Sequence, residues 1–123
     1  MSDVLFKDES YQIVGAAMDV WGALGFGFLE SVYEHALLIE LRERGLRAEN
    51  QVPVNVFYKD QTIGKFFVDV LVNDEIILEL KTAEQVSQNH MGQALNYLKA
   101  TNHRLAIILN FGPNRLEFKR MVV

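Results

Sequence analysis

The chain has 123 residues, of which 50% are hydrophobic and 23% charged, and its formal net charge is −4. This length suits one ordinary soluble domain and is too short for two hydrophobic cores. The acidic balance argues against a protein that holds nucleic acid through a broad basic face. It does not exclude an enzyme that meets phosphate through a bound cation, because the ion brings positive charge of its own.

No apolar run reaches the roughly 18–20 residues that a membrane helix needs, so no membrane association is predicted. The N-terminal residues lack the basic-then-apolar order of a secretion signal. The chain also has no cysteine, which excludes disulfides and thiolate metal sites. Together these features predict a cytoplasmic protein.

Two helices are predicted first, over Glu9–Leu24 and Leu29–Arg44, because apolar residues recur there at three- and four-residue steps. Ser10 is a candidate cap for the first helix, and Gly45 suits the position just after the second. Three glycines within six residues at the end of the first helix predict a sharp turn there: Gly22, Gly25 and Gly27.

Strands dominate the rest of the chain, with one helix from Ser87 to Thr101 among them. Runs rich in Val, Ile, Leu and Phe predict the strands Val52–Tyr58, Ile63–Val72, Ile76–Lys81, Leu105–Asn110 and Leu116–Val122. The order is therefore ααβββαββ. The step through the third helix predicts a parallel crossover between the two strands that flank it.

Two acids and one lysine interrupt the apolar runs of the second and third strands. Glu79 and Lys81 lie two apart and share one face of a strand, and Asp69 lies on the strand before. An ionised carboxylate taken out of water costs several kcal/mol unless a metal or a counter-charge compensates it. Spacing alone leaves two interpretations open, a cross-strand ion pair or a metal site.

The turn between these strands decides whether Asp69 can reach Glu79. A two-residue turn at Asn73-Asp74 pairs Asp69 with Leu78 and leaves Glu79 on the opposite face. A three-residue turn through Glu75, or one bulge, brings Asp69 directly across from Glu79, with Cβ atoms roughly 4.5–5.5 Å apart. The metal-site interpretation requires the second arrangement.

Such a set of side chains supports metal-dependent attack on phosphate. Carboxylate oxygens suit Mg²⁺ or Mn²⁺, which polarise a phosphoryl oxygen and lower the pKa of water, and Lys81 can position that water. Glu30 fits either a helix-start cap with Gly27 or a further acid near the ion. Gln93, one turn before Tyr97, fits either a polar helix flank or a residue that binds phosphate or water.

Five short motifs follow one another between about Ser10 and Arg120: Gly27-Phe-Leu-Glu30-Ser-Val-Tyr33, Phe67-Val-Asp69-Val-Leu-Val, Ile77-Leu-Glu79-Leu-Lys81, Gln93-Ala-Leu-Asn-Tyr97-Leu-Lys-Ala and Leu109-Asn-Phe-Gly112. In this order they resemble the PD-(D/E)xK nuclease superfamily and, more narrowly, the small bacterial and archaeal GxxExxY proteins. The chain departs from the superfamily pattern where Val68, rather than proline, precedes Asp69.

The resemblance implies an α/β fold with a restriction-endonuclease-like core, in which helices flank a mixed five-stranded sheet, in one domain over residues 1–123. It also implies roles for six residues: Asp69, Glu79 and the Leu80 carbonyl as metal ligands, Lys81 as the water-orienting residue, Glu30 as an accessory acid, and Gln93 on the helix after the ExK strand.

The expected function is a nuclease, a Mg²⁺- or Mn²⁺-dependent phosphodiesterase acting on nucleic acid, with DNA and RNA both open. The alternative is a nuclease-fold binding module that does not cleave, or a subunit of a larger complex. A third expectation, a homodimer, rests on aromatic residues near a sheet edge: Phe57, Tyr58 and Phe66.

Overall fold

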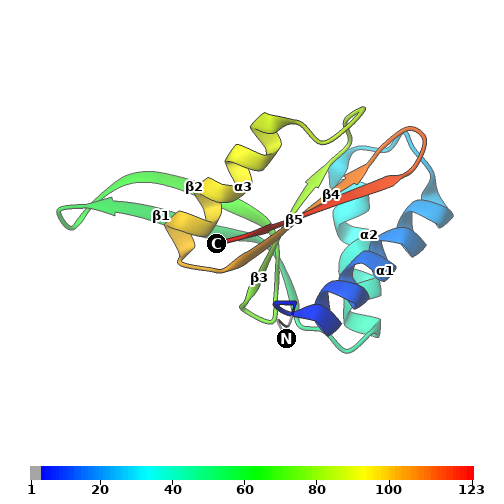
Figure 1. The fold of residues 1–123 in the computed structure, drawn as a ribbon, viewed down its shortest axis with the longest axis horizontal. Helices are drawn as coiled ribbons and strands as arrows, with labels where there is room; N and C mark the ends of the chain where they lie inside the picture. The colour runs from blue at the N-terminus through cyan, green and yellow to red at the C-terminus, as the bar shows by residue number, and fades with distance from the viewer. Residues whose placement is uncertain (1–3) are drawn as a thin grey trace.

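The computed structural model describes residues 4–123, which form three helices and one five-stranded sheet (Figure 1). Residues 1–3, which are part of the stretch considered above for a secretion signal, lie outside the described residues. The elements are α1 (Lys7–Leu24), α2 (Glu30–Glu43), β1 (Ala48–Tyr58), β2 (Gln61–Val72), β3 (Ile76–Lys81), α3 (Gln88–Thr101), β4 (Leu105–Phe111) and β5 (Leu116–Val122). The predicted α/β class and the order ααβββαββ are confirmed.

The strands lie in the order of the chain, β1-β2-β3-β4-β5. Neighbouring strands are antiparallel except β3 and β4, which are parallel and are connected through α3. A parallel pair requires such a crossover because a tight turn can only reverse the chain. The mixed sheet therefore has the crossover that the sequence predicts.

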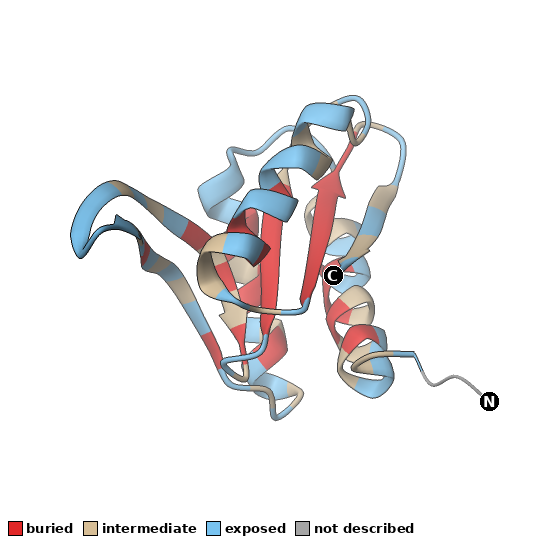
Figure 2. Ribbon diagram, turned by 60° about the vertical axis from the view of Figure 1, so that its left-hand side comes forward, coloured by how far each residue is buried: buried red, intermediate tan, exposed pale blue. Residues whose placement is uncertain are grey.

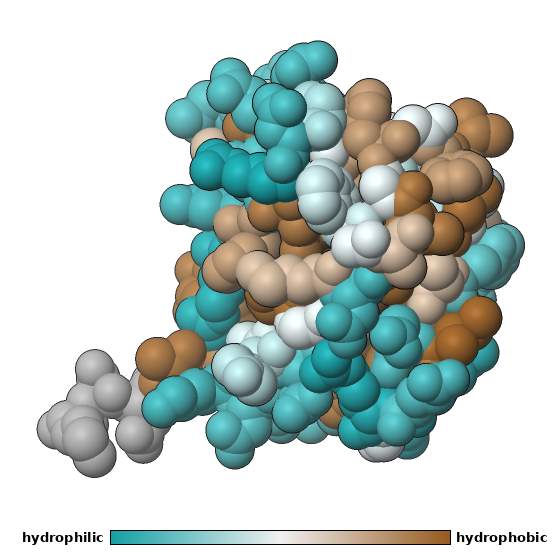
Figure 3. Space-filling view, turned by 90° about the vertical axis from the view of Figure 1, so that its right-hand side faces the viewer, coloured by the Kyte–Doolittle hydropathy of each residue, from teal (hydrophilic) through white to brown (hydrophobic). Residues whose placement is uncertain are grey.

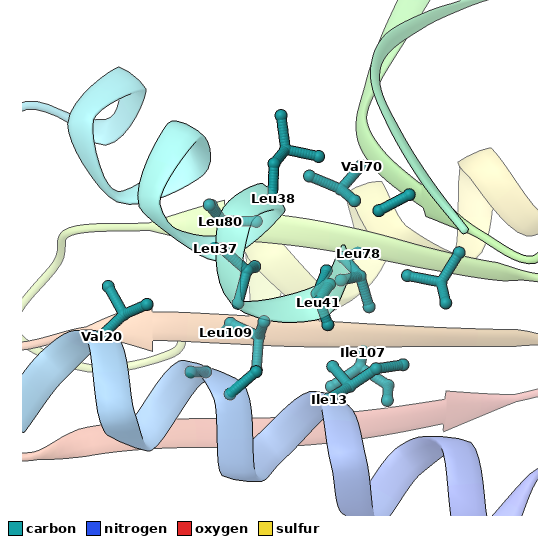
Figure 4. Close-up of a cluster of buried hydrophobic side chains, with 14 of the residues drawn as sticks. Ile13, Val20, Leu37, Leu38, Leu41, Val70, Leu78, Leu80, Ile107 and Leu109 are labelled. Atoms are coloured by element: carbon teal, nitrogen blue, oxygen red, sulfur yellow. The ribbon is translucent and has the colours of Figure 1, made fainter. Parts of the chain in front are cut away.

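Helices cover both faces of the sheet. The α1/α2 core lies under the first two helices and includes Ile13, Val20, Leu37, Leu38, Leu41, Val70, Leu78, Leu80, Ile107 and Leu109 (Figure 4). The α3 core on the other face is formed by Val54, Val68, Ile77, Ala94, Tyr97, Leu98, Ala106 and Ile108. Every residue of β4 is buried, as expected for a strand covered on both faces (Figure 2).

Two of the helix caps expected from the sequence are not formed. Ser10 does not cap α1, because the helix begins at Lys7 and Ser10 is buried within it. Gly27 does not cap α2, because the N-cap position is Leu29 and Glu30 is the first helical residue. The predicted cap of α3 is present: the Ser87 hydroxyl accepts a hydrogen bond from the His90 backbone N–H, and His90 Nδ1 accepts one from the Ser87 N–H.

β1 and β2 extend beyond the rest of the sheet as a two-stranded arm, defined here as residues 52–68 (Figure 1). Most of the arm is exposed, in contrast to the buried centre of the sheet (Figure 2). Phe57 and Tyr58 are exposed near its tip, as expected. Phe66 is not an exposed edge residue, because its ring packs on Tyr97 of α3 at 4.7 Å between centroids.

The two strands of the arm change faces at Gln51 and Asp69. Val70 and Val72 point into the α1/α2 core, whereas Val68 points into the α3 core. Gln51 adopts a φ of 50°, in the left-handed region that residues other than glycine rarely occupy. This local distortion lets β1 make the same exchange, with Ala48 in the α1/α2 core and Val54 in the α3 core.

Hydrophobic side chains also reach the surface. Figure 3 shows them gathered on part of the face that carries α1 and α2, next to mainly polar surface. The connection between these helices contributes exposed apolar residues: Phe26, Phe28 and Leu29. None of the helices within residues 4–123 has the length and apolar character needed to cross a membrane.

Candidate active site

The loop between β2 and β3 has the three residues that the metal-site interpretation requires. Val72 pairs with Ile76 and Val70 with Leu78, so the loop is Asn73–Glu75. Asn73 and Asp74 both have positive φ, a conformation that Asn and Asp tolerate better than most residues. If the same register is extended by one residue beyond Val70 and Leu78, Asp69 lies across from Glu79.

β2 separates from β3 immediately beyond this point, because their pairing ends at Val70 and Leu78. The Asp69 carboxylate fills the resulting gap, where its Oδ2 accepts a hydrogen bond of 2.8 Å from the Leu80 backbone N–H. Burial raises the pKa of Asp69, whereas this bond, the charge of Lys81 and the nearby Gln51 side chain counteract the rise. A side chain thus takes the place of a neighbouring strand at the candidate site.

Glu79 is the most deeply buried acid of the group, with 2% of its surface exposed. Burial, followed by the negative charge of Asp69, raises its pKa from 4.5 to about 9, and the charge of Lys81 acts in the opposite direction. Its Oε1 atom is buried and has no hydrogen-bond partner. Buried polar atoms are nearly always partnered, so this carboxylate oxygen would take a partner such as a water molecule or a cation.

Lys81 is held by α3 rather than by an acid. Its Nζ donates a hydrogen bond of 2.8 Å to Gln93 Oε1, and Gln93 Nε2 donates one of 3.2 Å to the Tyr97 hydroxyl. Within residues 4–123 no carboxylate lies within ion-pair distance of Lys81, since the two salt bridges found there join other residues. The cross-strand ion-pair interpretation is therefore wrong.

Glu30 lies at the first position of α2. Its carboxyl group is close enough to Lys81 and Asp69 for their charges to shift its pKa. Burial raises its pKa, the charge of Lys81 lowers it, and the charge of Asp69 raises it. Three acids and one lysine from three elements thus converge where β2 leaves β3.

The loop before Glu30 is fixed by Tyr33, which is fully buried and stacks on Phe111 with ring centroids 4.5 Å apart. The Tyr33 hydroxyl donates to the Gly25 carbonyl and accepts from the Phe28 N–H. The GxxExxY spacing thereby acquires a physical explanation. Tyr33, one turn into the helix, fixes the loop that precedes Glu30 through these two hydrogen bonds.

Sequence reasoning missed two residues beside this group, Glu34 and Gln51. Glu34 is 7% exposed and accepts hydrogen bonds from Asn50 Nδ2 at 3.0 Å and from Gln51 Nε2 at 2.8 Å. One signal was available in the sequence, since Glu34 falls on the apolar stripe that continues through Leu37 and Leu41. The sequence around Gln51 gives no such signal, because its contact with Glu34 depends on the change of faces in β1.

The side chains can be tested for their fit to a divalent cation. Within the described part of the chain, no three His, Cys, Asp or Glu side chains lie close enough together to hold an ion by themselves. The set expected from the sequence is smaller, two carboxylates and the Leu80 carbonyl, and all of its donors are the oxygens that Mg²⁺ and Mn²⁺ prefer. The orphaned Glu79 oxygen also fits such an ion. His90 is engaged in capping α3.

Comparison with known proteins shows the family and the fold of this chain. A family model described as the PD-(D/E)XK nuclease superfamily matches residues 7–121. The crystal structure of SSO0001 is similar in fold, with a TM-score of 0.59 and 18% identity over 76% of this chain and 50% of that chain. This chain thus matches about half the length of that protein. No curated protein is similar enough to count as a match. The restriction-endonuclease-like fold expected from the sequence is confirmed.

Proposed function

Because this chain belongs to the PD-(D/E)XK nuclease superfamily, we propose that it is a Mg²⁺- or Mn²⁺-dependent nuclease that hydrolyses phosphodiester bonds in nucleic acid. Within the superfamily, we propose that it is one of the GxxExxY proteins, a proposal supported by the spacing of Gly27, Glu30 and Tyr33. The observation that carries the proposal is the convergence of Asp69, Glu79 and Lys81 with an orphaned carboxylate oxygen.

Asp69, Glu79 and the Leu80 carbonyl would hold the cation. A cation bound there supplies the charge that polarises a phosphoryl oxygen and lowers the pKa of a water molecule. It would also relieve the repulsion between the two carboxylates, which raises the pKa of Glu79 in addition to burial.

Lys81 would orient the attacking water and offset negative charge as the phosphate is attacked. Gln93 supports this role by fixing the ammonium group from α3. Glu30 would accept or donate a proton beside the reacting group, since its raised pKa brings it nearer to neutral pH.

A second candidate is a nuclease-fold module that binds nucleic acid without cleaving it, alone or within a larger complex. The net charge of −4 favours it, because little basic surface is left to hold a long duplex. Homodimer formation through Phe57 and Tyr58 and a cytoplasmic location also remain predictions.

The test is cleavage of duplex, single-stranded and branched DNA and of RNA with Mg²⁺ or Mn²⁺. The wild-type chain should nick or digest at least one substrate, and Lys81→Ala should lower the rate at least about 100-fold, since the loss of one charge-stabilising group costs about that much. Lys119→Ala, on an exposed lysine of β5, is the matched control and should cleave as the wild type does. No cleavage of any substrate by folded wild-type protein would favour the binding module.

A further inference from the structure

Glu34 is a buried acid to which the proposed mechanism gives no role. It lies one turn after Glu30 on α2, and its two carboxylate oxygens accept from the side-chain amides of Asn50 and Gln51. No lysine, arginine or histidine forms a salt bridge with it in the part of the chain that the structure describes. A carboxylate buried at such cost implies that at least one of its hydrogen bonds does something that an apolar residue could not.

Gln51, one of those two partners, is held in a strained conformation opposite Asp69. The β1–β2 pairs on either side are Asn50 with Val70 and Val52 with Val68, and the register omits the pair between them. Gln51 has a φ of 50° there. Such strain persists only where the surroundings over-determine the conformation, and it gathers at functional sites.

The Gln51 amide thus lies between two carboxylates. One N–H donates to Glu34 Oε1 at 2.8 Å, and the same side chain lies near enough to the Asp69 carboxylate opposite it to lower the pKa of that acid. A glutamine amide carries two N–H donors, so it can serve both acids at once. Because Glu34 is anchored on α2, it fixes the direction in which the second donor points.

We propose that Glu34 and Gln51 are positioning residues for Asp69. Glu34 orients the Gln51 amide, and Gln51 holds the Asp69 carboxylate against the Leu80 N–H and across from Glu79. The inference rests on the proposed function only in treating Asp69 as a metal ligand. Partners of this kind, one step removed from the ion, commonly change metal affinity about 10- to 100-fold.

The first measurement needs neither metal nor cleavage, because the Leu80 amide reports directly on Asp69. Gln51→Gly removes the side chain, and glycine suits the positive φ, so the substitution introduces no backbone strain. Hydrogen exchange of the Leu80 N–H, followed by NMR, should become about 5- to 10-fold faster, the equivalent of one weakened hydrogen bond. Asn50→Ala is the matched control, since Asn50 contacts Glu34 but not the Asp69 side chain, and Leu80 exchange should remain as in the wild type.

The second measurement is Mn²⁺ binding by calorimetry with the full chain. Gln51→Gly and Glu34→Gln should each weaken Mn²⁺ binding about 10-fold or more. In Glu34→Gln, the new amide has a single acceptor oxygen, whereas the amides of Asn50 and Gln51 both donate to this position. Asn50→Ala should stay within about twofold of the wild type. If Glu34→Gln fails to fold, Mn²⁺ binding by Gln51→Gly still tests whether Gln51 positions Asp69.

Unchanged Leu80 exchange in Gln51→Gly overturns the positioning role, whatever the metal result. Faster exchange in Gln51→Gly but not in Asn50→Ala supports it, even if wild-type protein binds no Mn²⁺. A wild-type protein that binds no Mn²⁺ would instead contradict the metal site on which the proposed function depends. The two proposals can therefore fail separately.

Discussion

Lys81 Nζ donates a hydrogen bond of 2.8 Å to Gln93 Oε1, so the lysine of the ExK motif is fixed by a residue on another element. The same glutamine donates to the Tyr97 hydroxyl, which is buried against the sheet. The position of the ammonium group is thus set by α3. This arrangement leaves its charge free to act on a substrate, since no carboxylate neutralises it at close range in the described chain.

Gln93→Ala should lower nuclease activity about 10- to 100-fold without unfolding the protein. The substitution frees Lys81, and a catalytic group displaced by about 1 Å can lose that much rate. Steady-state cleavage assays should show the loss in kcat. Asn96→Ala, an exposed change on the same helix, is the control. Equal activity in the two variants would contradict the role of Gln93.

The metal-free protein should lose stability as the pH rises from about 5 to about 9. Burial and the charge of Asp69 raise the pKa of Glu79 to about 9 from 4.5. Over this interval the folded chain keeps a proton that the unfolded chain releases, so a higher pH favours unfolding. Denaturant unfolding in EDTA at about pH 5, 7 and 9 measures the slope.

Glu79→Gln should flatten that slope, because the amide does not titrate, and should raise stability at about pH 9 by on the order of 1–3 kcal/mol. Glu84→Gln, at an exposed position, should keep the wild-type slope. If the stability of the wild type does not fall with rising pH relative to that of Glu79→Gln, Glu79 is not protonated in the folded chain.

Tyr33→Phe should lower the free energy of unfolding by about 1–2 kcal/mol. The ring and its stacking on Phe111 remain, but the Gly25 carbonyl and the Phe28 N–H lose their partner. Urea unfolding measures the loss. Tyr11→Phe, at a tyrosine that is 76% exposed, should be neutral. If both variants are neutral, the hydroxyl does not hold the loop before Glu30.

Much of the fold could be predicted because its signals are local. The apolar run of β4 and the Ser87 cap of α3 each follow from a short stretch of sequence. β1 begins at Ala48 rather than Val52, and this difference has a physical reason. Residues 49–51 are polar and read as a loop, but this part of the chain pairs with β2 through backbone groups.

The candidate site was predictable in part. The sequence placed Glu79 and Lys81 on one face, but spacing left the position of Asp69 to the turn, and the three-residue loop settles it. The roles of these residues stay predictions until they are tested. Glu34 and Gln51 could not be joined to the site from sequence, because the contact between them depends on the tertiary packing of α2 on β1.

The change of faces at Gln51 and Asp69 means that the same two strands serve two hydrophobic cores in succession. On one side of this border the strands pack under α1 and α2, and on the other side they pack under α3. Asp69, a candidate metal ligand, therefore lies at the border between the two stretches of β2 that pack in different cores.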